Sequence, residues 1–356
     1  MSLRRAAEWK LHQAELALLR RAHPLRYLFL EVTRRCNLAC AYCGSSCNGA
    51  AQGDEMPSYE WVAVARQIAE DFDATKVMVA VTGGEPLVKE GIFDLFVELG
   101  RLGFPYGMVC NCQLLDADAA RRVVAAGMRS ISLSMDAPPA LNDELRGRGA
   151  SDKVVQAVGH LKAAGFKGKL EIISTITTPA IAQLEEMRRF VAGLQVPLWR
   201  ISPVMPIGRA AERKDLVPDR DGLRRILEFA REARLDGRLP VPEMSEEGFL
   251  GVEYEKKVRS FLWNCLAGVT IGGIMCDGRI GACPELGAAF VQGDIHRERF
   301  SKVWSERYQV FRDRSWAKKG ACATCGEFAR CQGGSLHLYS SPSADPLRCL
   351  YIDAVR

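Results

Sequence analysis

Four of the chain's 13 cysteines stand within one short stretch, "CNLACAYCGSSC", which runs from residue 36 to residue 47. Cys36, Cys40 and Cys43 have the spacing C-x3-C-x2-C. Three thiolates from one loop can bind three irons of a [4Fe–4S] cluster, which leaves the fourth iron open to a ligand that is not protein. A structural zinc site instead takes four protein ligands. The spacing alone leaves zinc, or three unrelated buried cysteines, as alternatives.

A second motif, "VTGGEPLV", begins at Val81 and contains Gly83, Gly84, Glu85 and Pro86. Glycine has no Cβ, so the backbone at these positions can approach a ligand closely. The adjacent carboxylate can accept a hydrogen bond from an ammonium group. Taken alone, the motif fits a tight turn between a strand and a helix better than it fits a binding site.

The elements that must position these residues alternate between strand and helix signals. Strand-like runs start near residues 26, 76, 104, 129, 169 and 197, and helical patterns such as "SYEWVAVARQIAEDF" and "LDADAARRVVAAG" lie between them. Six such units predict parallel strands with right-handed crossovers, fewer than the eight of a closed barrel. We therefore expect an α/β fold, a partial (β/α)6 TIM-type barrel. Both motifs follow strands, which places them at the end where such folds build their active sites.

Together, the cysteine motif after the first strand and the GGEP motif after the second resemble the radical S-adenosylmethionine (radical SAM) family. The resemblance extends from Arg26 to about Arg213. It implies that the three cysteines hold a [4Fe–4S] cluster and that Gly83–Glu85, with Pro86, meets the amino group of S-adenosylmethionine (SAM). It also implies that Tyr42 lies against the adenine. Reduction of the cluster would cleave SAM to a 5′-deoxyadenosyl radical, which abstracts a hydrogen from a substrate.

Two further segments extend this resemblance to the carboxylate of SAM. "SLSMDAPPALNDELRG" looks like the family pattern S-L-D-G…H-D…R-G, which implies Ser134 and Arg146 as contacts for that carboxylate. Ala137 and Asn142 replace the glycine and the histidine of the pattern, which weakens these two assignments. "PVMPIGRA", from residue 203, resembles the loop after the sixth strand.

The third strand ends in "VCNCQ", where the family usually has T-N-G, and it keeps Asn111 as a cofactor contact. On an extended strand, Cys110 and Cys112 would share one face and Asn111 would lie on the other. We expect Cys110, deeper in the strand, to be a small core residue.

A second set of seven cysteines follows residue 261 and includes "CATCGEFARCQGGS". This region resembles the SPASM domain, an auxiliary iron–sulfur module of peptide-modifying radical SAM enzymes. The resemblance implies one or two auxiliary [4Fe–4S] clusters, with a complete second set formed by Cys322, Cys325, Cys331 and Cys349. The first set lacks a cysteine because Ser335 stands at its usual place. We expect Cys265, Cys276 and Cys283 as ligands, with the fourth position unsettled.

Three alternatives remain for this first auxiliary site. Cys276 could replace the missing ligand, an open iron could bind substrate, or no first cluster forms. Two zinc ions, each with four cysteine ligands, could stabilise the same region.

The chain divides by pattern into four predicted parts. These are an N-terminal amphipathic helix (1–24), the radical SAM partial barrel (25–217), a helical linker (218–260) and the SPASM-like domain (261–356). The 24 residues before the barrel are too few for a separate domain that binds a leader peptide.

Composition excludes several classes of function. The net charge is only +5 over 356 residues, with no dense block of Lys and Arg, which argues against a nucleic-acid partner. No apolar run is long enough to cross a bilayer, and the N-terminus does not have the pattern of a signal peptide, so we expect a cytoplasmic protein without a membrane partner. Cysteines in a reducing compartment favour metal or redox chemistry over structural disulfides.

Three hypotheses for the function follow. The first is a peptide-modifying enzyme that matures a ribosomally made peptide by a cross-link or a related oxidation. The second is a small-molecule dehydrogenase or epimerase, in which Cys47 or Cys112 could return a hydrogen atom. The third, and least favoured, is a non-catalytic electron carrier, which would gain nothing from an open iron. Glu285 is a candidate base or substrate-facing acid, although a solvated surface charge is the more ordinary role. A reductase, flavodoxin or ferredoxin would supply electrons.

Overall fold

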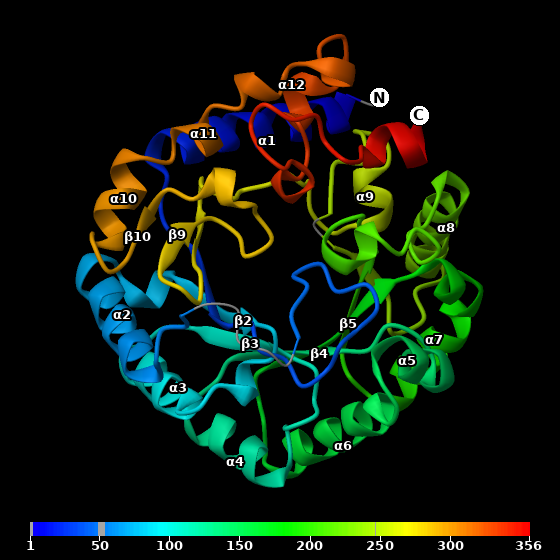
Figure 1. The fold of residues 1–356 in the computed structure, drawn as a ribbon. Helices are drawn as coiled ribbons and strands as arrows, with labels where there is room; N and C mark the ends of the chain where they lie inside the picture. The colour runs from blue at the N-terminus through cyan, green and yellow to red at the C-terminus, as the bar shows by residue number, and fades with distance from the viewer. Residues whose placement is uncertain (1–2, 49–53, 246) are drawn as a thin grey trace.

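Ten strands form one continuous, mostly parallel sheet, shown in Figure 1 by a computed structural model that describes residues 3–48, 54–245 and 247–356. The strands lie in the order β10-β9-β8-β1-β2-β3-β4-β5-β6-β7. Their bounds are β1 (Tyr27–Thr33), β2 (Met78–Gly83), β3 (Tyr106–Cys110), β4 (Ser130–Ser134), β5 (Lys169–Ile176), β6 (Leu198–Pro203), β7 (Pro242–Met244), β8 (Ile271–Ile274), β9 (Arg279–Gly281) and β10 (Gly293–Asp294).

Helices cover the outer side of the strands and form the rim of the barrel seen in Figure 1. The α-helices are α1 (Leu3–Ala22), α2 (Ser58–Asp71), α3 (Ile92–Arg101), α4 (Ala117–Ala125), α5 (Pro139–Arg146), α6 (Ala150–Ala163), α7 (Leu184–Leu194), α8 (Arg220–Asp236), α9 (Glu255–Val258), α10 (Phe300–Glu306), α11 (Gln309–Arg312) and α12 (Phe328–Cys331).

The six predicted strands are confirmed as β1 to β6, which pair in parallel and in chain order. Asp116 caps α4, because its carboxylate accepts a hydrogen bond from the N–H of Ala119 at 2.8 Å. Residues 178–183 form a 3-10 helix before α7 begins at Leu184. The fold is thus the expected partial barrel.

Two parts of the sheet come from outside the predicted barrel. β7, which pairs with β6, comes from the region predicted to be a helical linker. β8, from the predicted SPASM-like region, pairs in parallel with β1 through Tyr27 and Ile271, and β9 and β10 continue the sheet. The cysteine-rich region therefore shares a sheet with the barrel.

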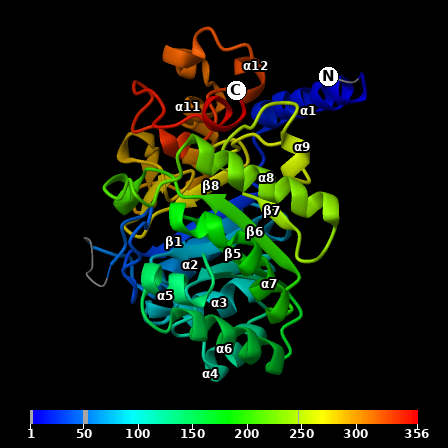
Figure 2. The same cartoon turned by 90° about the vertical axis from the view of Figure 1, so that its right-hand side faces the viewer.

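Helix α1 packs against the C-terminal half of the chain. Figures 1 and 2 both show it beside α12. Buried Trp9 makes an edge contact with Phe249 at 5.7 Å between ring centroids and joins a small apolar cluster with Trp263. Residues 1 and 2 of the predicted N-terminal helix lie outside the described residues. Within the described ranges, no helix combines the length and the apolar character needed to cross a membrane.

Candidate active site

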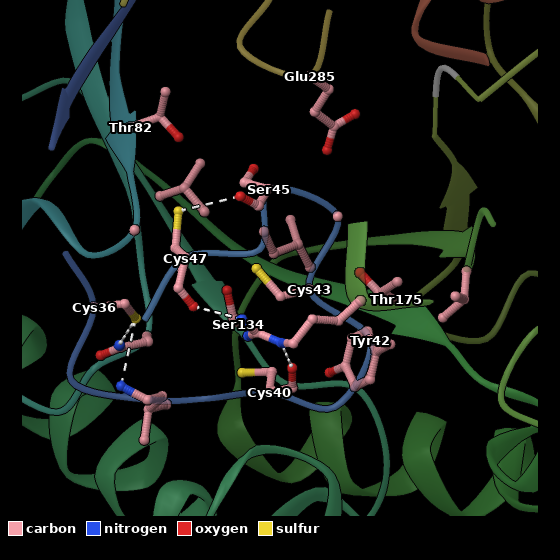
Figure 3. A pocket seen from close by; sticks show the side chains of 18 of the residues that line it. Cys36, Cys40, Tyr42, Cys43, Ser45, Cys47, Thr82, Ser134, Thr175 and Glu285 are labelled. Atoms are coloured by element: carbon pink, nitrogen blue, oxygen red, sulfur yellow. Dashed lines mark hydrogen bonds between the residues drawn. The ribbon is translucent and has the colours of Figure 1, made fainter. Parts of the chain in front are cut away.

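A cavity of about 270 Å³ lies at the C-terminal ends of the barrel strands (Figure 3). Parallel strands expose their last residues and the following loops at this edge, so segments far apart in the sequence meet here. The predicted site residues that line it are Cys36, Cys40, Tyr42, Cys43, Cys47, Gly83, Gly84, Asn111, Ser134, Arg146 and Glu285. The sequence motifs therefore do converge on one cavity.

The loop after β1 brings Cys36, Cys40 and Cys43 to the cavity wall. The sulfur of Cys36 accepts hydrogen bonds from the backbone N–H of Leu38 at 3.4 Å and from Nδ2 of Asn111 at 3.6 Å. Burial raises the pKa of Cys36, and these two donors oppose that rise because they favour the thiolate, which is the form that binds metal. These three thiols could therefore serve as metal ligands.

Arginines hold the backbone of this cysteine loop. Arg209, in the segment after β6, donates from Nε to the carbonyl oxygen of Cys40 at 2.8 Å and from Nη1 to that of Cys47 at 2.7 Å. Arg34 donates to the carbonyl oxygen of Ser45 at 2.6 Å. The loop after β6, which the sequence singled out only by resemblance, thus fixes the conformation of the cysteine loop.

Cys47 is buried, lines the cavity and lies beside Cys43, as Figure 3 shows. Its sulfur is 3.8 Å from the carbonyl oxygen of Ser45. A hydrogen bond from the Cys47 thiol lowers the pKa of Cys43 to about 5 and raises that of Cys47 well above its ordinary value. Cys47 therefore faces the same space as the three-cysteine motif.

The two glycines of the GGEP motif line the cavity, but its carboxylate does not point there. A Cβ on Gly84 would overlap the carbonyl oxygen of Arg35, and one on Gly83 would overlap that of Thr33. Glycine is thus required by the close approach of β1. Glu85 is fully buried and accepts hydrogen bonds from the backbone N–H of Asn111 at 2.7 Å and of Leu87 at 3.1 Å.

Burial raises the pKa of Glu85 to about 7, against the lowering effect of these two N–H donors. Neither Glu85 nor Pro86 lines the cavity formed by the described residues. The contact of the Gly83–Glu85 segment with the amino group of SAM stays a prediction, and in this structure the carboxylate of Glu85 ties the end of β2 to the end of β3.

The end of β3 differs in part from its prediction. Cys110 and Cys112 are both buried in the apolar core, as expected for Cys110, and Cys110 and Asn111 also line the cavity. Cys112 has a φ of 71°, so the chain turns there and does not alternate as an extended strand would. Cys112 does not line the cavity, which does not favour its predicted role in returning a hydrogen atom.

Asp136 organises the side of the cavity that holds Tyr42 and Arg146. Its buried carboxylate accepts hydrogen bonds from the Tyr42 hydroxyl, from Nε of Arg146, and from the backbone N–H of Thr175 at 2.6 Å. Asn142, which replaces the histidine of the family pattern, accepts a hydrogen bond from the N–H of Asp136 at 2.9 Å. Burial and this carboxylate raise the pKa of Tyr42 well above its ordinary value.

Carboxylates from the C-terminal half form the opposite side of the cavity. Glu285 reaches into the space near Cys43 from the loop after β9, as Figure 3 shows, so it is not a simple surface charge. Glu247 also lines the cavity and pairs with His337 at 3.2 Å. Burial lowers the pKa of His337, but Glu247 outweighs it and raises the pKa to about 9.

Four of the C-terminal cysteines form one group. Cys322, Cys331 and Cys349 line a space of about 30 Å³. Burial is the main cause that raises the pKa of Cys331, and the nearby thiols of Cys349 and Cys325 raise it further. Ser335 is buried beside the same space. The grouping is the one expected from the sequence for the second auxiliary set.

Cys276 and Cys283 lie at opposite ends of the β8–β9 hairpin. The two strands pair antiparallel with Gly273 opposite Gly281 and Ile274 opposite Ile280, so Cys276 lies toward the turn and Cys283 follows the other end. The backbone carbonyl of Cys276 accepts a hydrogen bond from the N–H of Met56 at 2.8 Å. This position does not favour the predicted role of Cys276 as a ligand of the same cluster as Cys283.

Cys265 does lie near Cys283, and two arginines accompany it, of which Arg314 is buried and Arg20 is half-buried. The Cys265 thiol contributes to raising the pKa of Cys283, after burial and Glu285. Arg314 donates to the carbonyl oxygen of Cys265 at 2.7 Å, and burial lowers the pKa of nearby Arg20 to about 10. The hydrogen bonds of the Arg314 side chain go to carbonyl oxygens only, and Nε of Arg20 has no partner among the described residues. Buried cations of this kind suit an anionic group beside Cys265.

Two family models match the chain. Residues 30–191 match the radical SAM superfamily, and residues 265–326 match the SPASM iron–sulfur cluster-binding domain. The chain is a radical SAM enzyme with a SPASM domain. The matched ranges contain the three-cysteine motif and most of the C-terminal cysteines, which confirms the family expected from the sequence.

Curated relatives of this radical SAM enzyme differ in what their names say they do. It is 28% identical over 322 residues to mycofactocin maturase MftC of Mycolicibacterium smegmatis, which covers 86% of this chain and 76% of the relative. It is 24% identical over 328 residues to the AdoMet-dependent heme synthase of Nitratidesulfovibrio vulgaris, covering 87% of each. A pre-heme d1 synthase of Dinoroseobacter shibae is 25% identical, over 92% of this chain and 87% of the relative.

Solved structures share the fold of the enzyme. Streptococcus suis SuiB bound to S-adenosylmethionine superposes with a TM-score of 0.71 at 20% identity, over 91% of this chain and 76% of that one. The anSMEcpe structure with bound AdoMet and the Cp18Cys peptide has a TM-score of 0.70 at 18% identity, over 92% and 94%. At these identities the structural similarity shows the fold alone, which is a partial barrel with a C-terminal domain.

The residues of the radical SAM enzyme fit [4Fe–4S] clusters better than single metal ions. In the described ranges, no three Cys, His, Asp or Glu side chains converge closely enough to hold one ion. The thiolates of a zinc site lie about 2.3 Å from one shared ion, whereas each cysteine of a [4Fe–4S] cluster binds a different iron. The three-cysteine loop with sulfur-directed donors, and the four-cysteine C-terminal group, are donor sets of the cluster kind.

Several residues that shape the site were not found from the sequence. Asp136 and Arg209 stood within quoted motifs, but no role was assigned to either. Glu247 and His337 gave no signal, because they are 90 residues apart and only the folded chain pairs them, with Glu247 at the cavity.

Proposed function

We propose that this radical SAM enzyme abstracts a hydrogen atom from a peptide and so modifies a ribosomally made peptide. Support comes from its likeness to mycofactocin maturase and from the position of the cavity between the cysteine loop and the SPASM side. When bound, the [4Fe–4S] cluster and SAM supply the electron and the 5′-deoxyadenosyl radical. The chain's own residues bind, orient and shield these groups.

Each group of residues has a proposed task. Cys36, Cys40 and Cys43 hold the cluster, and the cavity beside them receives SAM. Arg146, fixed by Asp136, and Ser134 face the carboxylate of SAM, while Tyr42 borders its adenine. Asn111, by its bond to the sulfur of Cys36, steadies that ligand. Gly83 and Gly84 contribute backbone to the cavity wall. Glu85 supports this wall through its hydrogen bond from the backbone N–H of Asn111.

The charge of the cavity is the observation that favours a peptide over a tetrapyrrole as the substrate. Tetrapyrroles carry carboxylates, which need cations in a binding site. The two cations in the described lining are Arg146 and Arg209, and both are already bonded, to Asp136 and to backbone carbonyl oxygens. The substrate side carries Glu247 and Glu285. A polyanionic substrate would therefore meet like charge, whereas a peptide need not.

A small-molecule epimerase is the second candidate, and the position of Cys47 favours it. Its thiol lines the cavity, where it could return a hydrogen atom to a substrate radical. Solvent deuterium would then appear in the product, and Cys47→Ser would abolish its incorporation. Cys112, which is in the core, is no longer placed for this task.

The number of auxiliary clusters is part of the proposal. Cys322, Cys325, Cys331 and Cys349 form one complete set. Cys265 and Cys283 could serve a further cluster, whose remaining ligands stay unsettled. A flavodoxin, ferredoxin or reductase would supply the electrons. We place the four parts of the chain as the sequence suggests, although β7 to β10 join one sheet with the barrel.

The deciding experiment tests substrates side by side. The enzyme, reconstituted anaerobically with iron and sulfide, receives SAM, dithionite and either the peptide encoded next to its gene or a heme precursor. We expect the peptide alone to stimulate formation of 5′-deoxyadenosine and to change in mass. Stimulation by the heme precursor and not by the peptide would overturn the proposal.

A further inference from the structure

Glu285 stands apart from the other charged residues that line the cavity. Arg146 and Arg209 are bonded, as described, and Glu247 pairs with His337. The carboxylate of Glu285 makes no hydrogen bond or ion pair with any described side chain or backbone group, and it is exposed to the cavity, whereas its backbone N–H donates to the thiol of Cys283. A carboxylate held without a partner in a partly enclosed space is costly, so a ligand that supplies hydrogen-bond donors would be favoured there.

Glu285 is also close to the reacting centre. Its Oε1 lies 3.5 Å from the position that a Cβ on Gly44 would take, and Gly44 directly follows Cys43. The Gly44 position is also bordered by Ile207, from the segment that carries Arg209. A group bound to the Glu285 carboxylate would therefore be held over the cysteine loop, on the side from which a substrate must approach.

The surroundings keep this region acidic. His337 is the cation that faces it, and its charge is shared with Glu247 at 3.2 Å. The two carboxylates of Glu247 and Glu285 face the single imidazolium of His337, so the substrate side of the cavity has a net negative charge. An ammonium or guanidinium group bound at Glu285 would balance this charge.

We infer that Glu285 binds a cationic group of the substrate, the ammonium or guanidinium of a basic peptide residue, and holds it above the three-cysteine loop. The N–H groups of that residue donate to the carboxylate of Glu285. This inference rests on the proposed peptide function and narrows it to peptides with a lysine or arginine near the modified position. Acidic peptides and polycarboxylates are disfavoured by the same charge.

The test measures which peptides bind. The holoenzyme with SAM, without reductant, is incubated with a pool of pentapeptides that are blocked at both ends and randomised at the central position, and bound peptides are identified by mass spectrometry. We expect Lys and Arg at the centre to be enriched about tenfold over norleucine, and Glu to be depleted, as for one charge-assisted hydrogen bond. E285Q should remove this preference.

Two controls separate the possible failures. Glu186, on the outer helix α7, is exposed, and E186Q should keep the preference of the unaltered enzyme. E285Q should retain the iron content of the unaltered enzyme, which shows that its clusters are assembled. Binding without a basic preference, or an unchanged preference in E285Q, would overturn the role of Glu285 alone. Failure to bind any peptide would overturn the peptide function as well.

A charge reversal gives a second, independent result. E285K should favour peptides with a central Glu or Asp over those with Lys or Arg, because the sign of the anchoring group has changed. If E285K loses its iron, E285Q still decides the question. Enrichment of basic peptides by an iron-loaded E285K would contradict the inference.

Discussion

Arg209 Nε donates a hydrogen bond to the carbonyl oxygen of Cys40 at 2.8 Å, across 169 residues of sequence. The same guanidinium reaches the carbonyl oxygen of Cys47 at 2.7 Å. The loop after β6 therefore holds the loop after β1 from the other side of the barrel. The conformation in which the cysteines face the cavity depends on this bridge.

Replacing Arg209 should weaken the binding of the three-cysteine cluster without unfolding the barrel. In R209A both carbonyl oxygens lose their donor, and we expect an affinity for iron lower by about tenfold, as for other residues that orient metal ligands. R209K should be intermediate, because an ammonium cannot reproduce the fixed geometry of the guanidinium. Iron content after desalting and the rate of SAM cleavage measure the effect.

The matched control is Arg213, four residues further on. It is exposed and pairs with Asp215 at 2.7 Å. R213A should keep its iron and its activity. Equal losses in R209A and R213A would show that the segment as a whole, and not the bond to Cys40, is responsible.

Gly84→Ala should destabilise the fold itself. The new Cβ would overlap the backbone carbonyl oxygen of Arg35, which cannot move without breaking its bond to the N–H of Glu85 at 3.0 Å. We expect a loss of about 2 kcal/mol or more in the free energy of unfolding. Gly159→Ala, in α6 with no heavy atom near the new Cβ, should be neutral or slightly stabilising. Denaturant titrations of the metal-free variants compare the two.

The positions of the motifs could be predicted because they are local. The cysteine motif and the GGEP motif each follow a strand whose apolar pattern is clear, and parallel strands bring their ends together. Six strands were found for the same reason. The grouping of Cys322, Cys325, Cys331 and Cys349 followed from a resemblance, and the structure places them together.

What the sequence could not provide were orientations and long-range partners. The hydrogen bond from Tyr42 to Asp136 joins residues 94 positions apart, so no local sequence pattern predicts it. Cys112 turns out of the strand direction with a positive φ, which a non-glycine residue seldom adopts. Cys276 was expected to replace the ligand missing at Ser335, but the pairing of the hairpin, which the spacing does not reveal, places it toward the turn and away from Cys283.

Glu31 should make the stability of the protein fall as pH rises from about 4.5 to about 7. Burial raises the pKa of this carboxyl from 4.5 to about 7, against the lowering effect of Arg34. In that window the folded state keeps the proton and the unfolded state has lost it, so folding is favoured at the acidic end. E31Q removes the titration. The shift corresponds to about 3 kcal/mol.

The measurement compares the free energy of unfolding of the unaltered protein with that of E31Q at each pH. Other carboxyls titrate in the same window, but they are shared by both proteins and cancel in the difference. The free energy of unfolding of the unaltered protein, minus that of E31Q, should decrease steadily between pH 5 and about 7. A flat difference, or one that increases with pH, would contradict the raised pKa.

Removing Cys276 should not change the number of irons that the enzyme binds. Cys276 lies toward the turn of the β8–β9 hairpin, whereas Cys283 follows its other end, so we do not expect the two thiols to share a cluster. Cys331, in contrast, lies in the four-cysteine group, so Cys331→Ala should lose about four irons per chain, the content of one [4Fe–4S] cluster. Iron and sulfide analysis of both variants, reconstituted side by side with the unaltered enzyme, makes the comparison. A loss of about four irons in Cys276→Ala would show that the hairpin opens when the cluster is assembled.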